Sequence, residues 1–171
     1  MPLSMYQVSV PVLVQMLSAL SGVLDKAEAH AAAKKIDPAA LLNDRLYPDM
    51  WPLLRQVQIA CDFAKGVGAR LAGIDPPVHE DTERTFGELR LRIGKTLDFL
   101  GGLKAAQIDG SEQREITIKL GGKPVTFKGE IYLVHFALPN FYFHCTTAYA
   151  ILRHNGVELG KRDFVGQVPG L

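Results

Sequence analysis

Asn140 and His144 are the pair of side chains whose types and spacing best suit a chemical site. They lie four residues apart in the longest helical pattern of the chain, which runs from Gly129 to Gly156. Helical geometry therefore places them about 40° apart, on one side of the helix. His144 is also the titratable side chain that the apolar pattern places inside the protein. A buried histidine needs hydrogen-bond partners, and it serves as a structural residue, a metal ligand or a general base.

Gln56 is the third candidate, because it lies one step from the apolar face of another predicted helix. With Asn140 and His144 it could hold a Zn²⁺ or Ni²⁺ ion, although such sites normally use His, Cys or carboxylate ligands. Two neutral amides and one imidazole would bind a metal weakly, and they better suit hydrogen bonds to a polar ligand or ordered water. His144 is therefore either a structural residue bonded to Gln56, Asn140 or a carbonyl, or a catalytic metal ligand or base.

Neighbouring side chains add a pocket wall but no second catalytic motif. Tyr142 and Trp51 each combine an apolar ring with a hydrogen-bond donor, so they could line a pocket mouth near His144. Cys145 follows His144 directly but lies about 100° away on the helix, which argues against a Cys–His dyad. The chain has no Gly-rich phosphate loop and no CxxC, HExxH or GxSxG motif. Nucleotide-dependent, zinc-protease and serine-hydrolase functions therefore have no support.

The element that must position Asn140 and His144 is a predicted helix over residues 129–156. Small or apolar side chains recur along it every three or four residues, as in a helix packed within a bundle. The expected inward row is Leu133, Ala137, Phe141, His144, Ala148 and Ile151. Pro139 interrupts the pattern, and its missing N–H predicts a bend at that point.

Three further amphipathic helices share this kind of pattern: residues 4–33, 49–72 and 85–100. Pro11 lies in the first of them and either kinks the helix or begins it. Thr85 and Glu88 fit a capping box at the start of the third, unless Asp81 or Thr82 starts that helix one turn earlier.

The connections between these helices carry their own signals. Asp49 is expected to cap the second helix. Residues 74–84 are expected to form a loop rich in Pro and acidic residues, with His79 solvated beside its acidic neighbours. Over residues 116–127 the spacing of apolar side chains changes from every three or four residues to every second residue. This alternation on both sides of Gly121 and Gly122 predicts a β-hairpin with a two-residue turn. The expected cross-strand pairs are Leu120 with Lys123, Ile118 with Val125, and Ile116 with Phe127.

Together these elements predict one all-α domain over residues 1–171, an antiparallel four-helix bundle with one small β-hairpin between the third and fourth helices. The net charge of +1 gives no sign of nucleic-acid binding. The apolar run from Val8 to Leu24 has no preceding Lys or Arg and is interrupted by polar residues, so neither a signal peptide nor a membrane span is expected. Two unclustered cysteines favour a reducing compartment, and we expect the cytoplasm.

The last helix and its tail resemble a known motif. The segment NFYFHCTTAYAILRHNGVELGKRDF is similar to the last helix of the DinB/YfiT-like superfamily, in which HxxxH precedes a segment ending in Leu-Arg, a Gly-Val turn and an Asp-aromatic pair. The resemblance extends from SMYQVSVPVL through MWPLLRQVQIACDFAKG to the end, and it indicates an uncharacterised bacterial branch. It implies a four-helix bundle, often dimeric, that binds a divalent metal through one His of helix 2 and two of the last helix. It also implies, for some members, thiol-dependent transferase or isomerase activity.

Carried onto this sequence, the resemblance gives a metal site in which His144 keeps its imidazole. Asn140 stands where the other last-helix His would be, and the helix 2 ligand falls near Gln56. The expected protein is a DinB-like bundle with a polar pocket and a degenerate metal site. The alternatives are a metal- or thiol-assisted transferase or hydrolase using His144, and a non-catalytic structural or small-molecule-binding module. A homodimer is expected, supported by four leucines that lie off the predicted inner stripe of the first helix: Leu13, Leu17, Leu20 and Leu24.

Overall fold

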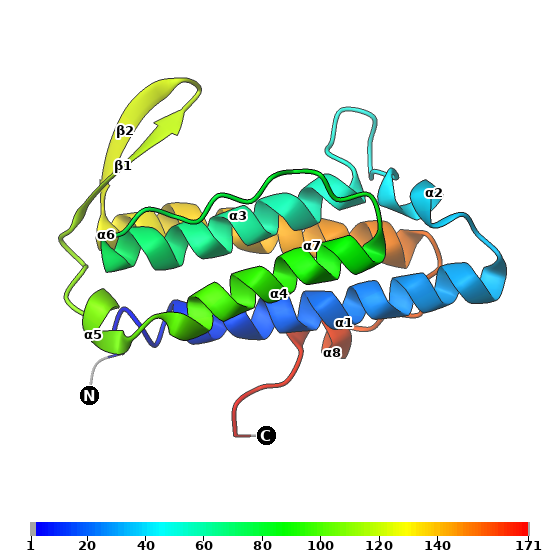
Figure 1. The fold of residues 1–171 in the computed structure, drawn as a ribbon, viewed down its shortest axis with the longest axis horizontal. Coiled ribbons are helices and arrows are strands. Elements are labelled where there is room, and N and C mark those ends of the chain that lie inside the picture. The colour runs from blue at the N-terminus through cyan, green and yellow to red at the C-terminus, as the bar shows by residue number, and fades with distance from the viewer. Residues whose placement is uncertain (1–2, 171) are drawn as a thin grey trace.

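The computed structural model describes residues 3–170, which are mostly helical with one small antiparallel sheet. Four long helices lie side by side (Figure 1): α1 (Val10–Lys34), α3 (Leu53–Ala72), α4 (Phe86–Gly102) and α7 (Leu138–His154). The short helices are α2 (Pro38–Leu42), α5 (Ala105–Ile108), α6 (Gly129–Ile131) and α8 (Lys161–Val165). A π-helical segment, η1 (Tyr132–Ala137), joins α6 to α7, and the strands are β1 (Glu115–Leu120) and β2 (Lys123–Lys128).

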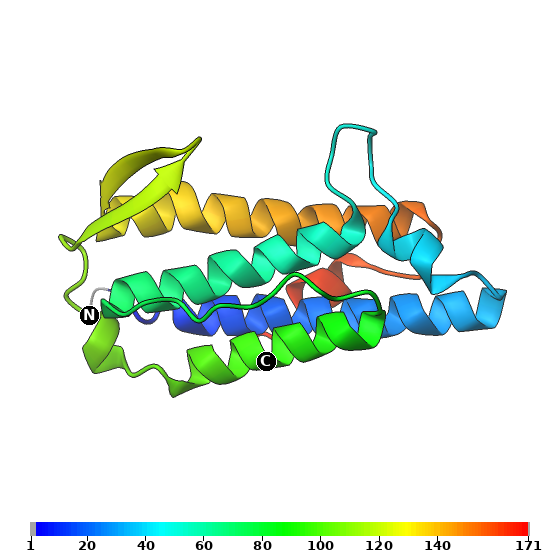
Figure 2. The ribbon, with the colours of Figure 1, turned by 45° about the horizontal axis from the view of Figure 1, so that its top comes forward.

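The connection from α3 to α4 is a long strap rather than a turn. Residues 73–85 run back along α3, so that α3 and α4 begin at the same end of the molecule (Figures 1 and 2). An extended chain of 13 residues spans about 40 Å, whereas a 20-residue helix is about 30 Å long, so the strap can cover the whole length of α3. The sequence predicted four helices in antiparallel order, and this connection departs from that order.

The residues predicted to face inward on the last helix lie in the core of the protein. Leu133, Ala137, Phe141, Ala148 and Ile151 are all fully buried. The apolar row of α3 is likewise buried at every position from Leu53 to Leu71 that the 3.6-residue period selects: Leu53, Val57, Ala60, Ala64, Val67 and Leu71. The packing of α3 against α7 therefore forms the part of the core that holds the candidate site.

The leucines of α1 correct one sequence-based expectation. Leu13, Leu17, Leu20 and Leu24, which were expected to be exposed, are between 0% and 4% exposed. Helix α1 contacts α4 on one side and α7 and α8 on others, so most of its circumference is covered. Met16, Ala19 and Val23 of the predicted stripe are buried too, so the leucines are covered by additional neighbours of α1. These leucines consequently give no support to a homodimer.

Local signals explain most helix boundaries. Pro11 begins α1 rather than kinking it, since it falls in the first turn, where its missing N–H is not needed. Thr85 and Glu88 form the predicted capping box of α4, which is confirmed. Asp49 does not cap α3; the helix starts at Leu53, after Pro52 in an extended conformation.

The hairpin has the predicted register. Leu120 pairs with Lys123, Ile118 with Val125, and Ile116 with Phe127, and both turn glycines have positive φ angles. Two glycines suit this turn because only residues without a Cβ adopt such angles freely. The hairpin lies at one end of the long helices, beside α6 (Figure 1).

Pro139 changes the last helix in a different way from the bend that the sequence predicted. The residues directly before it, Tyr132–Ala137, adopt a π-helical turn, and Pro139 stands in the first turn of α7. The wider turn accommodates a residue that has no N–H to donate. The row from Leu133 to Ile151 nevertheless stays on one face.

The C-terminal tail after α7 packs against the long helices. Val157 and Leu159 are buried, and Phe164 of α8 packs edge-to-face on Tyr149 of α7, with ring centroids 5.8 Å apart. Helix α1 is long and apolar enough to span a membrane by length and composition alone. Its buried leucines pack against other helices, which is the arrangement of a core helix.

Candidate functional site

His144 and Gln56 are brought together where α7 packs against α3. Nδ1 of His144 lies 2.7 Å from Oε1 of Gln56, and both residues are buried. The other side of the same amide is also engaged, because Nε2 of Gln56 donates to the carbonyl of Trp51 at 2.9 Å. A carbonyl can only accept, so this second bond fixes which end of the amide faces His144.

The amide of Gln56 in turn fixes the tautomer of the imidazole. Since Oε1 can only accept, Nδ1 of His144 must carry the proton and donate it. Nε2 of a neutral His144 then carries the lone pair. It has no hydrogen-bond partner among residues 3–170, and it is not one of their fully enclosed unpartnered atoms. The site therefore holds one oriented acceptor nitrogen that is not fully enclosed by protein.

The surroundings of His144 favour its neutral form. Burial, and to a smaller extent the positive charge of Arg55, lowers the pKa of His144 to about 4. Both effects disfavour an imidazolium. At neutral pH the ring is consequently an acceptor and a weak base rather than a cation.

Aromatic rings hold the imidazole on two sides. Phe63 of α3 stacks on it, with centroids 5.9 Å apart and planes at 20°. Phe143 meets it edge-on at 5.2 Å and 88°, and the Phe143 side chain is 54% exposed. These rings and Gln56 leave His144 little rotational freedom.

The other predicted site residues are placed differently. Asn140 is partly buried, and its amide donates to the carbonyl of Phe136 at 2.7 Å, one turn back on its own helix. Trp51 approaches the site through its backbone carbonyl, while its side chain is 60% exposed. Tyr142 is partly buried against Phe141, with ring centroids 5.7 Å apart, and burial raises its pKa.

The donors present do not fit a typical transition-metal site. Residues 3–170 contain no cluster of three His, Cys, Asp or Glu side chains that could hold a metal ion. Around His144 the remaining candidates are amides, and the oxygen of Gln56 is already bonded to the imidazole. Soft or borderline ions such as Zn²⁺ and Ni²⁺ prefer imidazole, thiolate and carboxylate ligands.

The two cysteines are buried thiols. Burial raises the pKa of Cys61 to about 12, and burial also raises that of Cys145. Both remain protonated at neutral pH, and a protonated, buried thiol is a poor nucleophile. Neither is poised for thiol chemistry.

Sequence reasoning missed a charge cluster around a buried arginine, where α3, α4 and the strap meet. Arg92 of α4, whose side chain is 1% exposed, contacts Asp62 at 2.8 Å, Asp81 at 3.0 Å and Glu83 at 3.1 Å. Two of these carboxylates belong to the strap, so the cluster fastens the strap to α3 and α4. The available signal was an arginine next to the apolar row of α4, together with an acid-rich loop of unusual length.

Four pockets of about 310–480 Å³ are open in the described residues, and neither Gln56 nor His144 lines any of these four. One of about 480 Å³ lies between the hairpin and the long helices, and Phe63 and Phe136 are among its lining residues. Because Phe63 also stacks on His144, this cavity is next to the candidate site.

Comparison with known proteins gives the family. The model of the domain of unknown function DUF1993 matches residues 5–165. The curated proteins contain no match to the chain. Among solved structures, that of a DinB family member protein from Shewanella denitrificans is 45% identical, covers 97% of this chain and 94% of its own, and superposes with a TM-score of 0.87. The resemblance seen in the last helix is therefore confirmed, and the chain belongs to the DUF1993 family of DinB-like domains.

Proposed function

We propose that this chain is a single-domain, DinB-like four-helix bundle protein that binds a small polar molecule at His144 and needs no metal to do so. The observation that carries the proposal is the 2.7 Å hydrogen bond from Nδ1 of His144 to Gln56, which leaves Nε2 as an oriented acceptor. A low pKa keeps this nitrogen unprotonated at neutral pH. On this proposal, Asn140 and Gln56 supply hydrogen-bonding amides at the positions where the family resemblance implies histidine ligands to a metal.

The surroundings suggest what such a molecule looks like. It must offer an O–H or N–H donor to Nε2 of His144, because that nitrogen can only accept. Phe63 and Phe143 flank the ring, so a flat apolar part would pack well against them. We therefore expect a small aromatic or conjugated molecule with one hydrogen-bond donor.

Phenol is a direct probe of this proposal, and toluene is its matched control because it lacks the donor. We expect phenol to shift the ring ¹⁵N resonance of Nε2 of His144 saturably, and toluene to leave it unchanged. His144→Phe keeps an aromatic ring of similar size and should abolish phenol binding. Equal binding of phenol to His144→Phe would contradict the proposal.

A second candidate is a metal- or thiol-assisted transferase or hydrolase with His144 as metal ligand or base. A hydrogen bond on one ring nitrogen is also how metal-binding histidines are usually oriented. Metal analysis of protein purified without a His tag separates the two. A stoichiometric transition metal that is lost in His144→Ala would support the enzyme, and metal-free protein that binds phenol would support the binding module.

The homodimer and the cytoplasmic location are also proposals. The dimer rests on the family resemblance alone, since the leucines of α1 are used in the core. The location rests on two buried, unpaired cysteines. Sedimentation at micromolar concentration tests the first, and a monomer there would refute it.

A further inference from the structure

The cavity of about 480 Å³ that lies against the hairpin, called here the hairpin cavity, has the size of a small-molecule site. It is enclosed by three elements: β1 of the hairpin, α3 and the π-helical segment η1. All three meet at the end of the long helices where the hairpin stands (Figure 1).

Aromatic rings form the apolar wall of the hairpin cavity. The ring centroid of Phe136 lies 5.9 Å from that of Phe63 and 6.1 Å from that of Tyr132, and all three residues belong to the lining. Phe127 of β2 stacks on Phe136 at 5.3 Å and supports this wall without being part of the lining. Aromatic walls of this kind suit a flat apolar ring, which packs on them by offset stacking or edge-to-face contact.

Arg70 is the charged side chain that a ligand in this cavity can reach. Its Nη1 donates to the hydroxyl of Tyr132 at 2.9 Å, and its guanidinium carbon lies 5.8 Å from the centre of the Tyr132 ring. Gly66, one turn earlier on α3, leaves space for this arrangement, because a Cβ there would collide with Nη1. Tyr132 and Gly66 therefore hold the guanidinium at the cavity.

Two donor nitrogens of Arg70 are left for a ligand. Nε and Nη2 make no hydrogen bond within residues 3–170, and neither is one of their fully enclosed unpartnered atoms. Arg70 also forms no ion pair in that part of the chain. Nε–H and one N–H of Nη2 are parallel, so they match the two oxygens of a single carboxylate.

The charges of the lining favour an anion. Arg70 and Lys119 are positive and Asp62 is negative, which gives the lining a net charge of +1. The carboxylate of Asp62 is already paired, with Lys65 at 3.0 Å and with Arg92 at 2.8 Å. Lys119 is exposed and has no ion pair in the described chain, so its charge at the opening is free to attract an anion.

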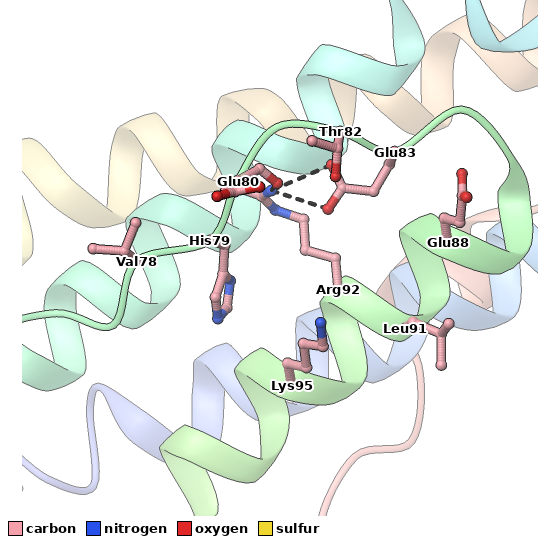
Figure 3. A pocket seen from close by; sticks show the side chains of 9 residues that line it. All are labelled: Val78, His79, Glu80, Thr82, Glu83, Glu88, Leu91, Arg92 and Lys95. Carbon is pink, nitrogen blue, oxygen red and sulfur yellow. Dashed lines mark hydrogen bonds and ion pairs between the residues drawn. The ribbon is translucent and has the colours of Figure 1, made fainter.

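The pocket between the strap and α4 has the opposite charge balance (Figure 3). There Glu80, Glu83 and Glu88 outnumber Arg92 and Lys95, and Arg92 is already bonded to Glu83. Those acidic side chains oppose an anion, so the hairpin cavity is the better anion site.

We propose that the hairpin cavity binds a planar aromatic monocarboxylate. The carboxylate accepts from Nε–H and Nη2–H of Arg70, and the ring packs on Phe63 and Phe136. Neither Gln56 nor His144 lines this cavity, so the proposal does not depend on the function proposed at His144.

Benzoate is the probe, with benzamide and acetate as matched comparisons. Benzamide keeps the shape of benzoate without its charge, and acetate keeps the charge without the ring. We expect saturable one-to-one binding of benzoate in calorimetry, together with a shift of the Arg70 Nε–H resonance. Benzamide and acetate should each bind about tenfold more weakly or worse, since each lacks one of the two contacts. No saturable binding of benzoate, or equal binding of either comparison, would overturn the proposal.

Variants locate the binding on the lining. Arg70→Gln should weaken benzoate binding about tenfold or more, because it removes the paired donors and the charge. Lys119→Gln should weaken it about twofold to fivefold at low salt, as expected for an exposed charge. Lys123→Gln removes an exposed lysine of the same hairpin that does not line the cavity, and it should have no effect. Unchanged binding in Arg70→Gln, or equal losses in Lys119→Gln and Lys123→Gln, would refute the assignment.

Two further measurements separate this cavity from the site at His144. His144→Phe keeps a ring against Phe63 and should leave benzoate binding unchanged, whereas loss of benzoate binding there would refute a separate cavity. The comparison of benzoate with benzamide uses the native protein, so it remains decisive even if Arg70→Gln does not fold.

Discussion

The hydrogen bond between Gln56 and His144 leads to a quantitative prediction. Gln56→Leu keeps the volume of the side chain but removes the acceptor for Nδ1–H and the donor to the Trp51 carbonyl. A buried donor left without a partner costs about 1–3 kcal/mol. In a chain of this size each kcal/mol lowers Tm by about 2–4 °C. We expect Gln56→Leu to lower Tm by about 2–12 °C.

A double-mutant cycle tests whether the loss arises from the unpaired imidazole. His144→Phe removes the donor, so Gln56→Leu should be less harmful in the His144→Phe background than in the native one. We expect a coupling free energy of about 1 kcal/mol or more from urea unfolding. Gln113→Leu is the matched control on an exposed loop, with an expected change within about 0.5 kcal/mol. Additive losses in the cycle would refute the reasoning.

Three more predictions concern stability. The pKa of His144 falls from 6.5 in the unfolded chain to about 4 in the folded one, so the unfolded state binds more protons between these values. The free energy of unfolding should therefore be highest above pH 6.5 and decline by at most about 3 kcal/mol as the pH drops to 4. A urea midpoint that stays constant from pH 7 to 4 would contradict this. Leu17→Ala should cost about 2–5 kcal/mol in urea unfolding because Leu17 is fully buried, whereas Leu91→Ala at an exposed position should cost little; similar losses would contradict the packing of α1. Thr85→Ala should lower stability by about 1 kcal/mol through loss of the capping box, and an unchanged midpoint would show that the cap is not used.

Periodicity predicted the elements around the site well. The inward rows of α3 and α7 and the register of the hairpin depend on local spacing, and local spacing is read directly from the sequence. The contact between Gln56 and His144 follows from two such rows meeting where α3 packs against α7. The bond from Gln56 to the Trp51 carbonyl could not be predicted, because it depends on how the chain enters α3.

Two features lay beyond a helix-by-helix reading of the chain. The direction of α4 is set by the strap, whose length was visible but whose path depends on Arg92 and its carboxylates. The burial of Leu13 and Leu17 depends on how many other helices pack against α1. The apolar pattern of a single helix does not show that number. The C-terminal α8 covers a face of α1 that would otherwise be exposed.

The protonation state of His144 is the central claim, and ring ¹⁵N spectroscopy measures it directly. The spectra should show a neutral imidazole from pH 8 to pH 6, with the proton on Nδ1 and a free lone pair on Nε2. Gln56→Leu should remove the preference for this tautomer. A proton on Nε2 at neutral pH, or an imidazolium that forms above pH 6, would contradict the account.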